Sequence, residues 1–278
     1  MNLKKLADQV IVITGASSGI GLTTARMAAE QGARLVLVSR DQDSLDKLAE
    51  ELRVQGHEAL AVAADVGVQE EVERVGAKAI ERFGRIDTWI NNAGVSIFGR
   101  LEDVPMEDSH RMFQTNFWGV VNGSLEAVKH LKERGGALIN IGSEVSDRAI
   151  PLQGMYSASK HAVKGFTDSL RMELEHDQLP ISVTLVKPTA IDTMFTIHAK
   201  NYLEKEPRLP PPVYAPDIVA KAVLYAAQHP QRDVFVGGPA KMSAMGSYYA
   251  PRMLDRVNRS ATYRNQMSDQ WADPARGD

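Results

Sequence analysis

Hydrophobic residues lie along the first half of the chain in short, nearly continuous runs, which alternate with longer stretches of helical spacing. The runs predict buried β-strands at Val10–Thr14, Arg34–Ser39, Ala59–Ala63 and Thr88–Asn91. The longer stretches predict helices at 20–31, from a cap at Asp41 or Asp43 to about Gln55, and at Gln69–Phe83, where Gly84 ends the helix. Apolar strands that alternate with helices are typical of a parallel sheet covered on both faces.

The same alternation continues through the second half of the chain. It predicts helices at about 106–133, around Tyr156 and Lys160, and at about 217–229, and strands at 137–141, 182–186 and Asp233–Val236. A proline-rich loop is expected at 206–216. No internal repeat and no long linker interrupts these elements. We therefore expect one doubly wound α/β domain over residues 1–238, followed by a C-terminal extension over 239–278.

Composition narrows the classes of function. The 278 residues are 44% hydrophobic and 24% charged with a formal net charge of -3, so no basic field favours nucleic acid or an anionic membrane. The absence of cysteine excludes disulfides and thiol catalysis, and no metal site is expected. No apolar run approaches the roughly 18 residues of a membrane-spanning helix, and the expected location is therefore the cytoplasm.

A glycine-rich turn, Thr14-Gly15-Ala16-Ser17-Ser18-Gly19-Ile20-Gly21, lies between the first predicted strand and the first predicted helix. Glycines permit a tight turn and the close approach of a pyrophosphate, which a helix N-terminus attracts through its amide groups and dipole. The turn is not a P-loop, because no Gly-Lys-Ser/Thr follows. A purely structural turn is the alternative to dinucleotide binding.

The end of the second strand bears on which dinucleotide binds. An acidic residue often stands there to bond the ribose diol, but this strand ends Ser39-Arg40, and the guanidinium of Arg40 suits a 2′-phosphate. A solvated Arg40 at the start of a loop is the alternative. Asp65, which ends the third strand, could accept a hydrogen bond from adenine or cap the next turn.

Further polar residues follow the later strands. Asn91-Asn92-Ala93-Gly94 ends the fourth strand, where small residues permit close contact with a ligand and Asn side chains can tie adjacent strands together. Asn116 is a polar residue on a mostly apolar helix and therefore needs a hydrogen-bond partner. Ser143 follows the strand at 137–141, so its hydroxyl could bond a substrate oxygen.

Tyr156 and Lys160 stand four residues apart, which places them on one face of a predicted helix. A nearby ammonium favours phenolate over phenol and so lowers the pKa of a tyrosine. Such a tyrosine can give or take a proton near neutral pH. Both residue types are common, so the pair by itself equally describes the surface of an ordinary helix.

Over residues 8–238 the chain resembles the classical short-chain dehydrogenases/reductases, in the order and spacing of the family's motifs. The resemblance rests on residues 14–21 and 91–94 and on Asn116, Ser143, Tyr156, Lys160 and Pro188. It implies a Rossmann-like fold with a seven-stranded parallel sheet, a bound NAD(P), and a homodimer or homotetramer. It also implies that the cofactor contacts Gly15, Ser17, Ser18, Gly19, Ile20, Gly21, Arg40, Asp65, Val66, Asn92, Ala93, Gly94, Tyr156, Lys160, Pro188 and Thr193.

The resemblance further implies a catalytic tetrad of Asn116, Ser143, Tyr156 and Lys160, with Ser143 and Tyr156 contacting the substrate. Tyr156 would be the general acid in carbonyl reduction or the base in alcohol oxidation. Lys160 would lower the pKa of Tyr156 and bind the nicotinamide ribose. Ser143 would orient the substrate oxygen, and Asn116 would help to hold a water that relays protons to Lys160.

One position departs from the family pattern. The family usually has Pro-Gly after the sixth strand and a threonine four residues further on, whereas this chain has Pro188-Thr189, with Thr193 retained for the carboxamide. Thr189 makes the backbone less permissive than glycine would. The expected consequence concerns the geometry of this loop and not cofactor binding.

The substrate pocket and the tail are the least determined regions. Candidate pocket residues are Ser96, Phe98, Glu144, Ile150, Leu152, Gln153, Met155, Met194 and Phe195, a mostly apolar set that favours an apolar ketone, aldehyde or alcohol. Residues 189–216 resemble a mobile lid. In the extension, apolar residues alternate with arginines, which predicts an amphipathic helix that packs on the body, a partner subunit or a membrane surface. Residues 268–278 are expected to be disordered.

The sequence thus predicts an NADP(H)-dependent oxidoreductase that interconverts a carbonyl and an alcohol of small-molecule size, without nucleic-acid partners or a membrane span. An NAD-preferring dehydrogenase is the first alternative. A cofactor-binding regulator without turnover is the second, although a binder would not need Tyr156 together with Lys160.

Overall fold

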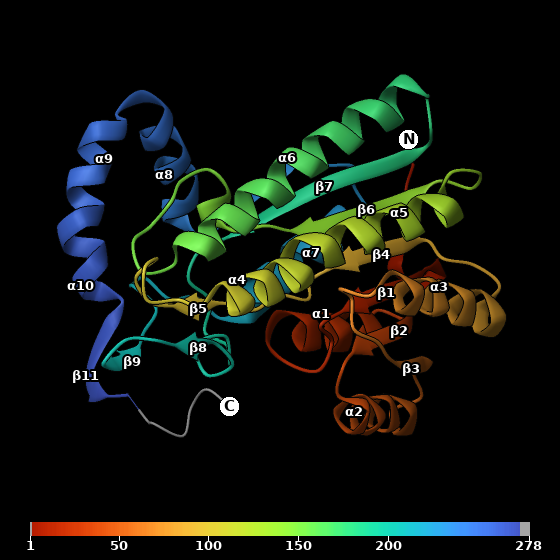
Figure 1. The fold of residues 1–278 in the computed structure, drawn as a ribbon. Helices are drawn as coiled ribbons and strands as arrows, with labels where there is room; N and C mark the ends of the chain where they lie inside the picture. The colour runs from red at the N-terminus through yellow and green to blue at the C-terminus, as the bar shows by residue number, and fades with distance from the viewer. Residues whose placement is uncertain (1, 273–278) are drawn as a thin grey trace.

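A seven-stranded parallel sheet forms the centre of the protein, with the strand order β10-β7-β6-β4-β1-β2-β3 (Figure 1). The computed structural model describes residues 2–272, apart from the side chains of 239–243. The strands are β1 (Val10–Thr14), β2 (Arg34–Ser39), β3 (Ala59–Ala63), β4 (Thr88–Asn91), β6 (Gly136–Ile141), β7 (Ile181–Pro188) and β10 (Asp233–Val236). The predicted fold class is confirmed.

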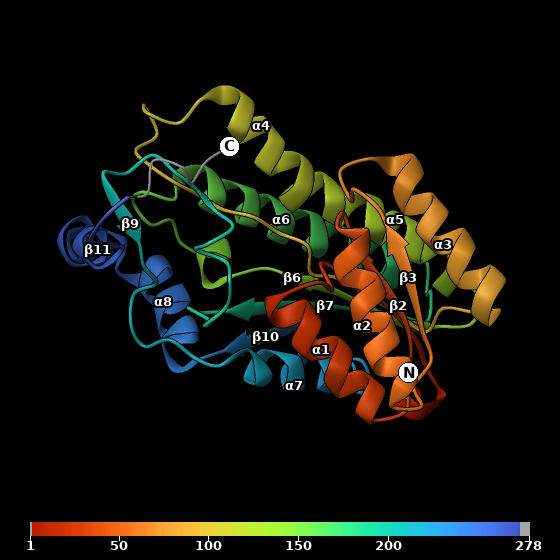
Figure 2. The same ribbon diagram turned by 90° about the horizontal axis from the view of Figure 1, so that it is seen from below.

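Two layers of helices cover the sheet (Figure 2). One layer holds α1 (Gly19–Glu30), α2 (Gln42–Val54) and α7 (Pro216–Ala226); the other holds α3 (Gln69–Phe83), α5 (Gly119–Leu131) and α6 (Gly154–His176). Because successive strand residues point to opposite faces, Ile11 and Ile13 pack under the first layer while Val10 and Val12 pack under the second. The strands are therefore apolar on both faces.

The helix expected at about 106–133 contains an irregular segment in its middle. It consists of α4 (Met106–Phe113), a π-helical segment η2 (Gln114–Trp118) and α5. A π segment inserts an extra residue into a helix and is often found at functional sites. This one carries Asn116 into the interior of the protein.

The C-terminal extension is more ordered than the sequence predicts. It comprises α8 (Gly238–Tyr249), α9 (Pro251–Val257), a π-helical segment η4 (Asn258–Thr262), α10 (Tyr263–Asn265) and β11 (Met267–Trp271). β11 pairs antiparallel with β9 (Lys205–Pro207), which overlaps the start of the loop predicted at 206–216. The expected disorder is therefore wrong for residues 268–271, and residues 273–278 lie outside the described part of the chain.

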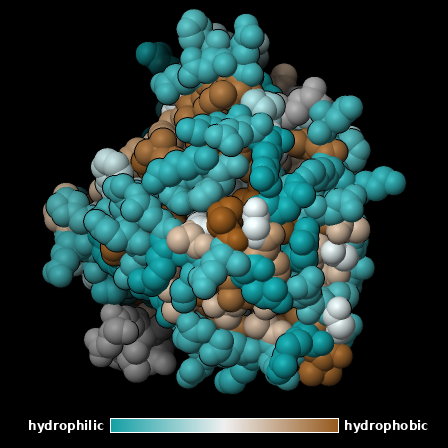
Figure 3. Space-filling model, turned by 90° about the vertical axis from the view of Figure 1, so that its right-hand side faces the viewer, coloured by the Kyte–Doolittle hydropathy of each residue, from teal (hydrophilic) through white to brown (hydrophobic). Residues whose placement is uncertain are grey.

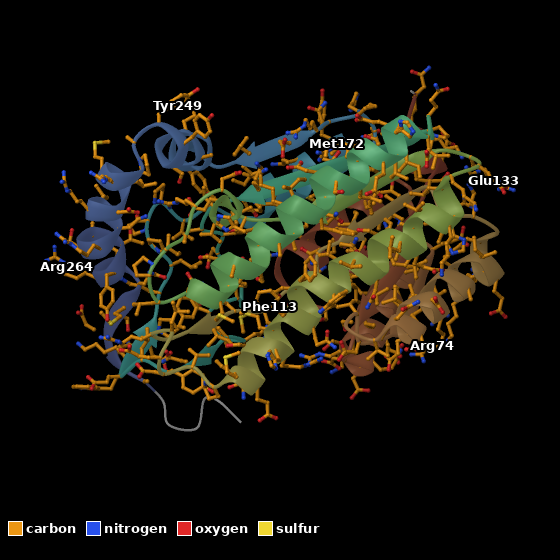
Figure 4. The ribbon with its side chains drawn as sticks, turned by 45° about the horizontal axis from the view of Figure 1, so that its top comes forward. Arg74, Phe113, Glu133, Met172, Tyr249 and Arg264 are labelled. Atoms are coloured by element: carbon orange, nitrogen blue, oxygen red, sulfur yellow. The ribbon has the colours of Figure 1, made fainter. Side chains whose placement is uncertain are left out.

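The remaining short elements lie around the ends of the sheet. They are η1 (Leu6–Asp8), η3 (Glu144–Ser146), and β5 (Ile97–Phe98), which pairs in parallel with β8 (Lys200–Asn201). Figure 4 shows Tyr249 and Arg264 on the extension at one end of the molecule and Glu133 near the opposite end. Figure 3 shows that this opposite end is mainly hydrophilic with scattered hydrophobic residues. In the described residues we find no helix that has both the length and the apolar character to cross a membrane.

Candidate active site

A cavity of about 590 Å³ opens at the carboxyl ends of β1 and β4. The chain winds from β1 to β2 and β3 on one side and crosses to β4 on the other, so the strand order switches here. Such a switch point is where parallel α/β sheets bind ligands. Of the predicted site residues, the cavity is lined by Gly15, Ser17, Ser18, Gly19, Ile20, Arg40, Asp65, Val66, Asn92, Ala93, Gly94, Ser143, Tyr156, Lys160, Pro188 and Thr193. Gly21 and Asn116 do not line it.

The glycine-rich turn forms one wall of the cavity. Gly15 and Gly19 have φ angles of +66° and +53°, which side-chain-bearing residues rarely adopt. A Cβ on Gly15 would also lie 2.9 Å from Ala93 Cα, so the backbone of the turn passes close to the end of β4. Ser18 precedes α1 without forming a side-chain cap, which leaves the first amides of the helix directed at the cavity.

Gly21 supports this turn from behind. A Cβ at this position would lie 2.1 Å from the carbonyl oxygen of Gly15, a distance at which the backbone must shift. We expect Gly21→Ala to lower the free energy of unfolding by about 3 kcal/mol, as overpacking does, and to weaken cofactor binding at least tenfold. Gly165→Ala is the matched control, because a Cβ on this helical glycine meets no atom within 4 Å. Thermal unfolding and cofactor titration of both variants check this; equal behaviour of the two would contradict it.

The two asparagines at the end of β4, Asn91 and Asn92, tie the strands together, as the sequence predicts. Asn92 Nδ2 donates to the carbonyl oxygens of Thr14 (3.0 Å) and Gly15 (3.1 Å). Asn91 Nδ2 donates to Asn140 Oδ1 on β6 at 2.9 Å. These bonds fix the end of β4 between its two neighbours.

Arg40 and Asp65 line the end of the cavity that is remote from Tyr156. Arg40 is exposed at the end of β2. Asp65 Oδ1 accepts a hydrogen bond from Gly67 N at 2.9 Å, so it caps its own turn, and Oδ2 pairs with Arg111 of α4. Burial raises the pKa of Asp65, but the bonds from Arg111 and Gly67 outweigh it and hold the pKa below its usual value. The partner Arg111 was not foreseen from the sequence.

Tyr156, Ser143 and Lys160 converge at the other end of the cavity. Tyr156 is 8% exposed on the first turn of α6, and the Ser143 hydroxyl hydrogen-bonds it from the N-cap of η3. Lys160 Nζ donates to the carbonyl oxygen of Ile141 at 2.9 Å and lies 5.8 Å from the centroid of the Tyr156 ring.

The titration of these groups departs from the expectation. Burial raises the pKa of Tyr156 to about 12, against the lowering effect of Ser143 and with a further rise from Glu144. Burial also lowers the pKa of Lys160 to about 8. The pKa of Tyr156 is thus raised and not lowered as expected, because desolvation of the phenolate is the largest effect and Lys160 is not among the groups that shift it.

Asn116 is fully buried behind the cavity. Its Oδ1 accepts from Val95 N at 2.8 Å, and its Nδ2 donates to the Val95 carbonyl at 2.9 Å and to Ser159 Oγ at 3.2 Å. A Cβ on Gly94 would lie 3.5 Å from Asn116 Oδ1 and 3.7 Å from Lys160 Nζ. Asn116 therefore finds the partners it needs and stands close to Lys160 without facing the cavity.

The Pro188-Thr189 departure is accommodated by a neighbouring strand. Thr189 N donates to the carbonyl of Val236 at 3.0 Å. The adjacent Gly237 has φ +101°, and a Cβ there would lie 2.2 Å from Thr189 Oγ1. Gly237 therefore leaves the room that the side chain of Thr189 occupies, and Thr193 lines the cavity next to Gly19.

The wall around Tyr156 contains five of the nine candidate pocket residues, Glu144, Ile150, Gln153, Met194 and Phe195. Ser96, Phe98, Leu152 and Met155 do not line the cavity; Ser96 instead accepts a hydrogen bond from Gln153, and Phe98 is fully buried. Sequence reasoning missed Val145, His198 and Leu209. His198 and Leu209 belong to the segment 189–216, where no periodic sequence pattern indicates which side chains face the cavity.

Comparison with known proteins agrees with this geometry. The family model for short chain dehydrogenases matches residues 9–203. YxnA, an uncharacterized oxidoreductase of Bacillus subtilis (strain 168), is 51% identical over 277 residues, 99% of this chain and 78% of that protein.

Two solved structures share the fold at appreciable identity. An alcohol dehydrogenase from the archaeon Thermococcus sibiricus, complexed with 5-hydroxy-NADP, is 33% identical with a TM-score of 0.71 and covers 82% of this chain and 95% of its own. A short chain dehydrogenase from Burkholderia cenocepacia J2315 in complex with NADP is 27% identical with a TM-score of 0.77, covering 91% and 98%. This chain belongs to the short-chain dehydrogenase family and is an NAD(P)-dependent dehydrogenase/reductase.

Proposed function

We propose that the protein is an NADP(H)-dependent oxidoreductase that interconverts a carbonyl compound and an alcohol, with Tyr156 as the general acid or base. The observation that carries this proposal is the convergence of Tyr156, Ser143 and Lys160 in one cavity with the glycine-rich turn. A binding protein without turnover has no use for a phenol and an amine buried side by side, since burial of both is costly.

In this proposal the nicotinamide supplies the hydride for reduction and accepts it in oxidation. The carbonyl oxygen accepts a hydrogen bond from the Ser143 hydroxyl, which fixes it beside the Tyr156 hydroxyl. As the carbonyl carbon gains the hydride, the oxygen gains negative charge and takes the proton of Tyr156. Oxidation runs in the opposite sense, with the Tyr156 phenolate removing the alcohol proton.

The cofactor residues are proposed on the fit of the cavity. The amides at the start of α1 and the close backbone of Gly15 suit a pyrophosphate. The phosphates would lie along Ser17, Ser18, Gly19 and Ile20, and the adenine would lie against Asp65 and Val66. The adjoining ribose would contact Asn92, Ala93 and Gly94, and the carboxamide would contact Pro188 and Thr193. Gly21 would support the turn from behind, as described above. Lys160, whose pKa of about 8 lets it carry a proton near neutral pH, would bind the nicotinamide ribose. Asn116 would support Lys160.

The preference for NADP(H) rests on Arg40. Its guanidinium lies at the end of β2, where it can pair with a 2′-phosphate, and the neighbouring Ser39 has no charge to attract a ribose diol. The two solved relatives named above were complexed with 5-hydroxy-NADP and NADP.

We expect Arg40→Ala to weaken NADPH binding at least tenfold and NADH binding less than about threefold, because one charge-assisted pair contributes a few kcal/mol at most. Fluorescence titration of both cofactors with the wild type and the variant measures this. An equal loss for both cofactors, or tighter NADH binding by the wild type, would leave an NAD-preferring dehydrogenase as the better proposal.

The homodimer or homotetramer stays a prediction from the family resemblance. Sedimentation of the full chain measures it directly.

A further inference from the structure

The wall of the cavity beside Tyr156 contains a carboxylate. Glu144 directly follows Ser143 and lines the cavity together with Ser143 and Tyr156. The residues around it are mostly apolar; they include Val145, Ile150, Met194 and Phe195. Asp41 and Asp65, the other carboxylates of the described lining, lie on the side of Arg40.

One oxygen of this carboxylate is paired and the other is not. Glu144 Oε2 accepts a hydrogen bond from Arg148 Nη2 at 3.0 Å. Oε1 accepts no hydrogen bond from any residue in the described part of the chain, and it is not sealed from the cavity. The side chain is only 13% exposed, so burial raises the pKa of Glu144, while the ion pair with Arg148 opposes that rise. An unpaired oxygen in such a site costs free energy unless a ligand donates to it.

The C-terminal extension fixes this arrangement from behind. Arg148 Nη1 lies 3.5 Å from Oδ1 of Asn258, which the π-helical segment η4 buries to 6% exposure. The fully buried Gln266 donates from Nε2 to the carbonyl of Pro151 at 2.7 Å. The loop after Ser143 is thus anchored at two points, and Glu144 is held where it is.

We propose that Glu144 accepts a hydrogen bond from a hydroxyl group of the substrate, on the carbon next to the reacting carbonyl. Ser143 and Glu144 both line the cavity, Ser143 bonds the Tyr156 hydroxyl, and the charge of Glu144 acts on the same hydroxyl, so the substrate groups that the two residues contact lie close to the reacting carbonyl. The substrate class is therefore an α-hydroxy ketone or aldehyde in reduction and a vicinal diol in oxidation. This inference rests on the proposed function and names the substrate of that same site.

The same carboxylate disfavours anionic substrates. A 2-oxo acid would place its carboxylate where the hydroxyl is proposed to bind, against Glu144. The alternative role for Glu144 is structural: its ion pair with Arg148 would then only fasten the loop, and the cavity would not distinguish a hydroxyl from a methyl group.

The experiment compares three ethyl ketones with NADPH: 1-hydroxy-2-butanone, 3-pentanone, in which a methyl group replaces the hydroxyl, and 2-oxobutanoate. For the wild type we expect kcat/KM for the hydroxyketone to exceed that for 3-pentanone by about 30-fold, as a hydrogen bond to a charged group provides, and 2-oxobutanoate to be the poorest. Glu144→Met, which keeps the length of the side chain, should bring the ratio of the first two near unity. Ile150→Val, which changes only the apolar wall, should keep the wild-type ratio.

A ratio near unity in the wild type, or an unchanged ratio in Glu144→Met, would overturn the inference while leaving the proposed function intact. So would failure to reduce the hydroxyketone under conditions in which other ketones are reduced. Absence of NADPH oxidation with every carbonyl compound would instead contradict the proposed function. Cofactor titration shows that each variant has folded, since Glu144 lies away from the glycine-rich turn.

Discussion

Tyr156→Phe is expected to lower kcat/KM for carbonyl reduction by about 1,000-fold, within the range that a positioned general acid contributes. The substitution removes the hydroxyl and its bond with Ser143 but keeps the ring, which packs edge-on against Phe195 with the centroids 5.4 Å apart. The fold and the cofactor site should survive. NADPH affinity should therefore change less than about threefold. Initial rates with a panel of ketones measure the loss of kcat/KM, and cofactor titration measures the affinity for NADPH.

The pH dependence gives an independent check of the same role. A phenol is the proton donor at every pH below its pKa, and burial raises the pKa of Tyr156 to about 12. Any loss of reduction through its deprotonation should therefore come well above neutral pH, whereas oxidation, which needs the phenolate, should rise with pH. Reduction by Tyr156→Phe at near wild-type rate would refute the proton-donor role, whereas absence of reduction by the wild type itself would favour the regulator without turnover.

How far the fold follows from the sequence can be seen in single elements. The strands of the central sheet are predictable because burial on both faces makes them continuous apolar runs, as in Val10–Thr14. β11 is not predictable, because Met267–Trp271 carries Ser268, Asp269 and Gln270 in a row and pairs with a strand some 60 residues earlier in the chain. β11 is ordered because it pairs with β9 and because the neighbouring Gln266 is buried. Neither contact can be read from the local sequence pattern.

The site shows a similar division. The turn at 14–21 and the pair Tyr156 and Lys160 are recognisable because their spacing is set by local backbone geometry. Gly21 belongs to that turn and Asn116 to the implied tetrad, yet neither lines the cavity. Arg111 was missed because its long side chain reaches across the fold to Asp65, whereas Arg148 stands only four residues after Glu144, in a segment that forms no continuous helix to set the pair by spacing. The raised pKa of Tyr156 depends on burial, which no spacing of residues reveals.

Lys160 illustrates the cost of such a site to the stability of the protein. It is 4% exposed, and within the described part of the chain its ammonium donates one hydrogen bond, to the carbonyl of Ile141. Burial lowers its pKa from 10.5 to about 8, so the folded state binds this proton more weakly than the unfolded chain does. If Lys160 has the proposed role, removing it should exchange activity for stability.

Lys160→Met is accordingly expected to lower kcat/KM at least about 100-fold and yet to raise the free energy of unfolding of the cofactor-free protein at pH 7. A pKa lowered from 10.5 to about 8 corresponds to a cost of about 3 kcal/mol in the folded state. Loss of the hydrogen bond to Ile141 destabilises the variant by about 1 kcal/mol, so the net stabilisation is about 2 kcal/mol.

The sign of the pH dependence distinguishes this explanation from improved packing. Between pH 8 and pH 10.5 the unfolded wild-type chain binds more protons at Lys160 than the folded protein, so wild-type stability should rise through this window. Lys160→Met lacks the group and should not show that rise, so its advantage should shrink as the pH approaches 10.5. Thermal unfolding of both proteins across the window measures the difference. If Lys160→Met were more stable than the wild type by the same amount at every pH, improved packing would be the explanation. If the variant were less stable than the wild type at pH 7, burial of the Lys160 ammonium would not destabilise the folded protein.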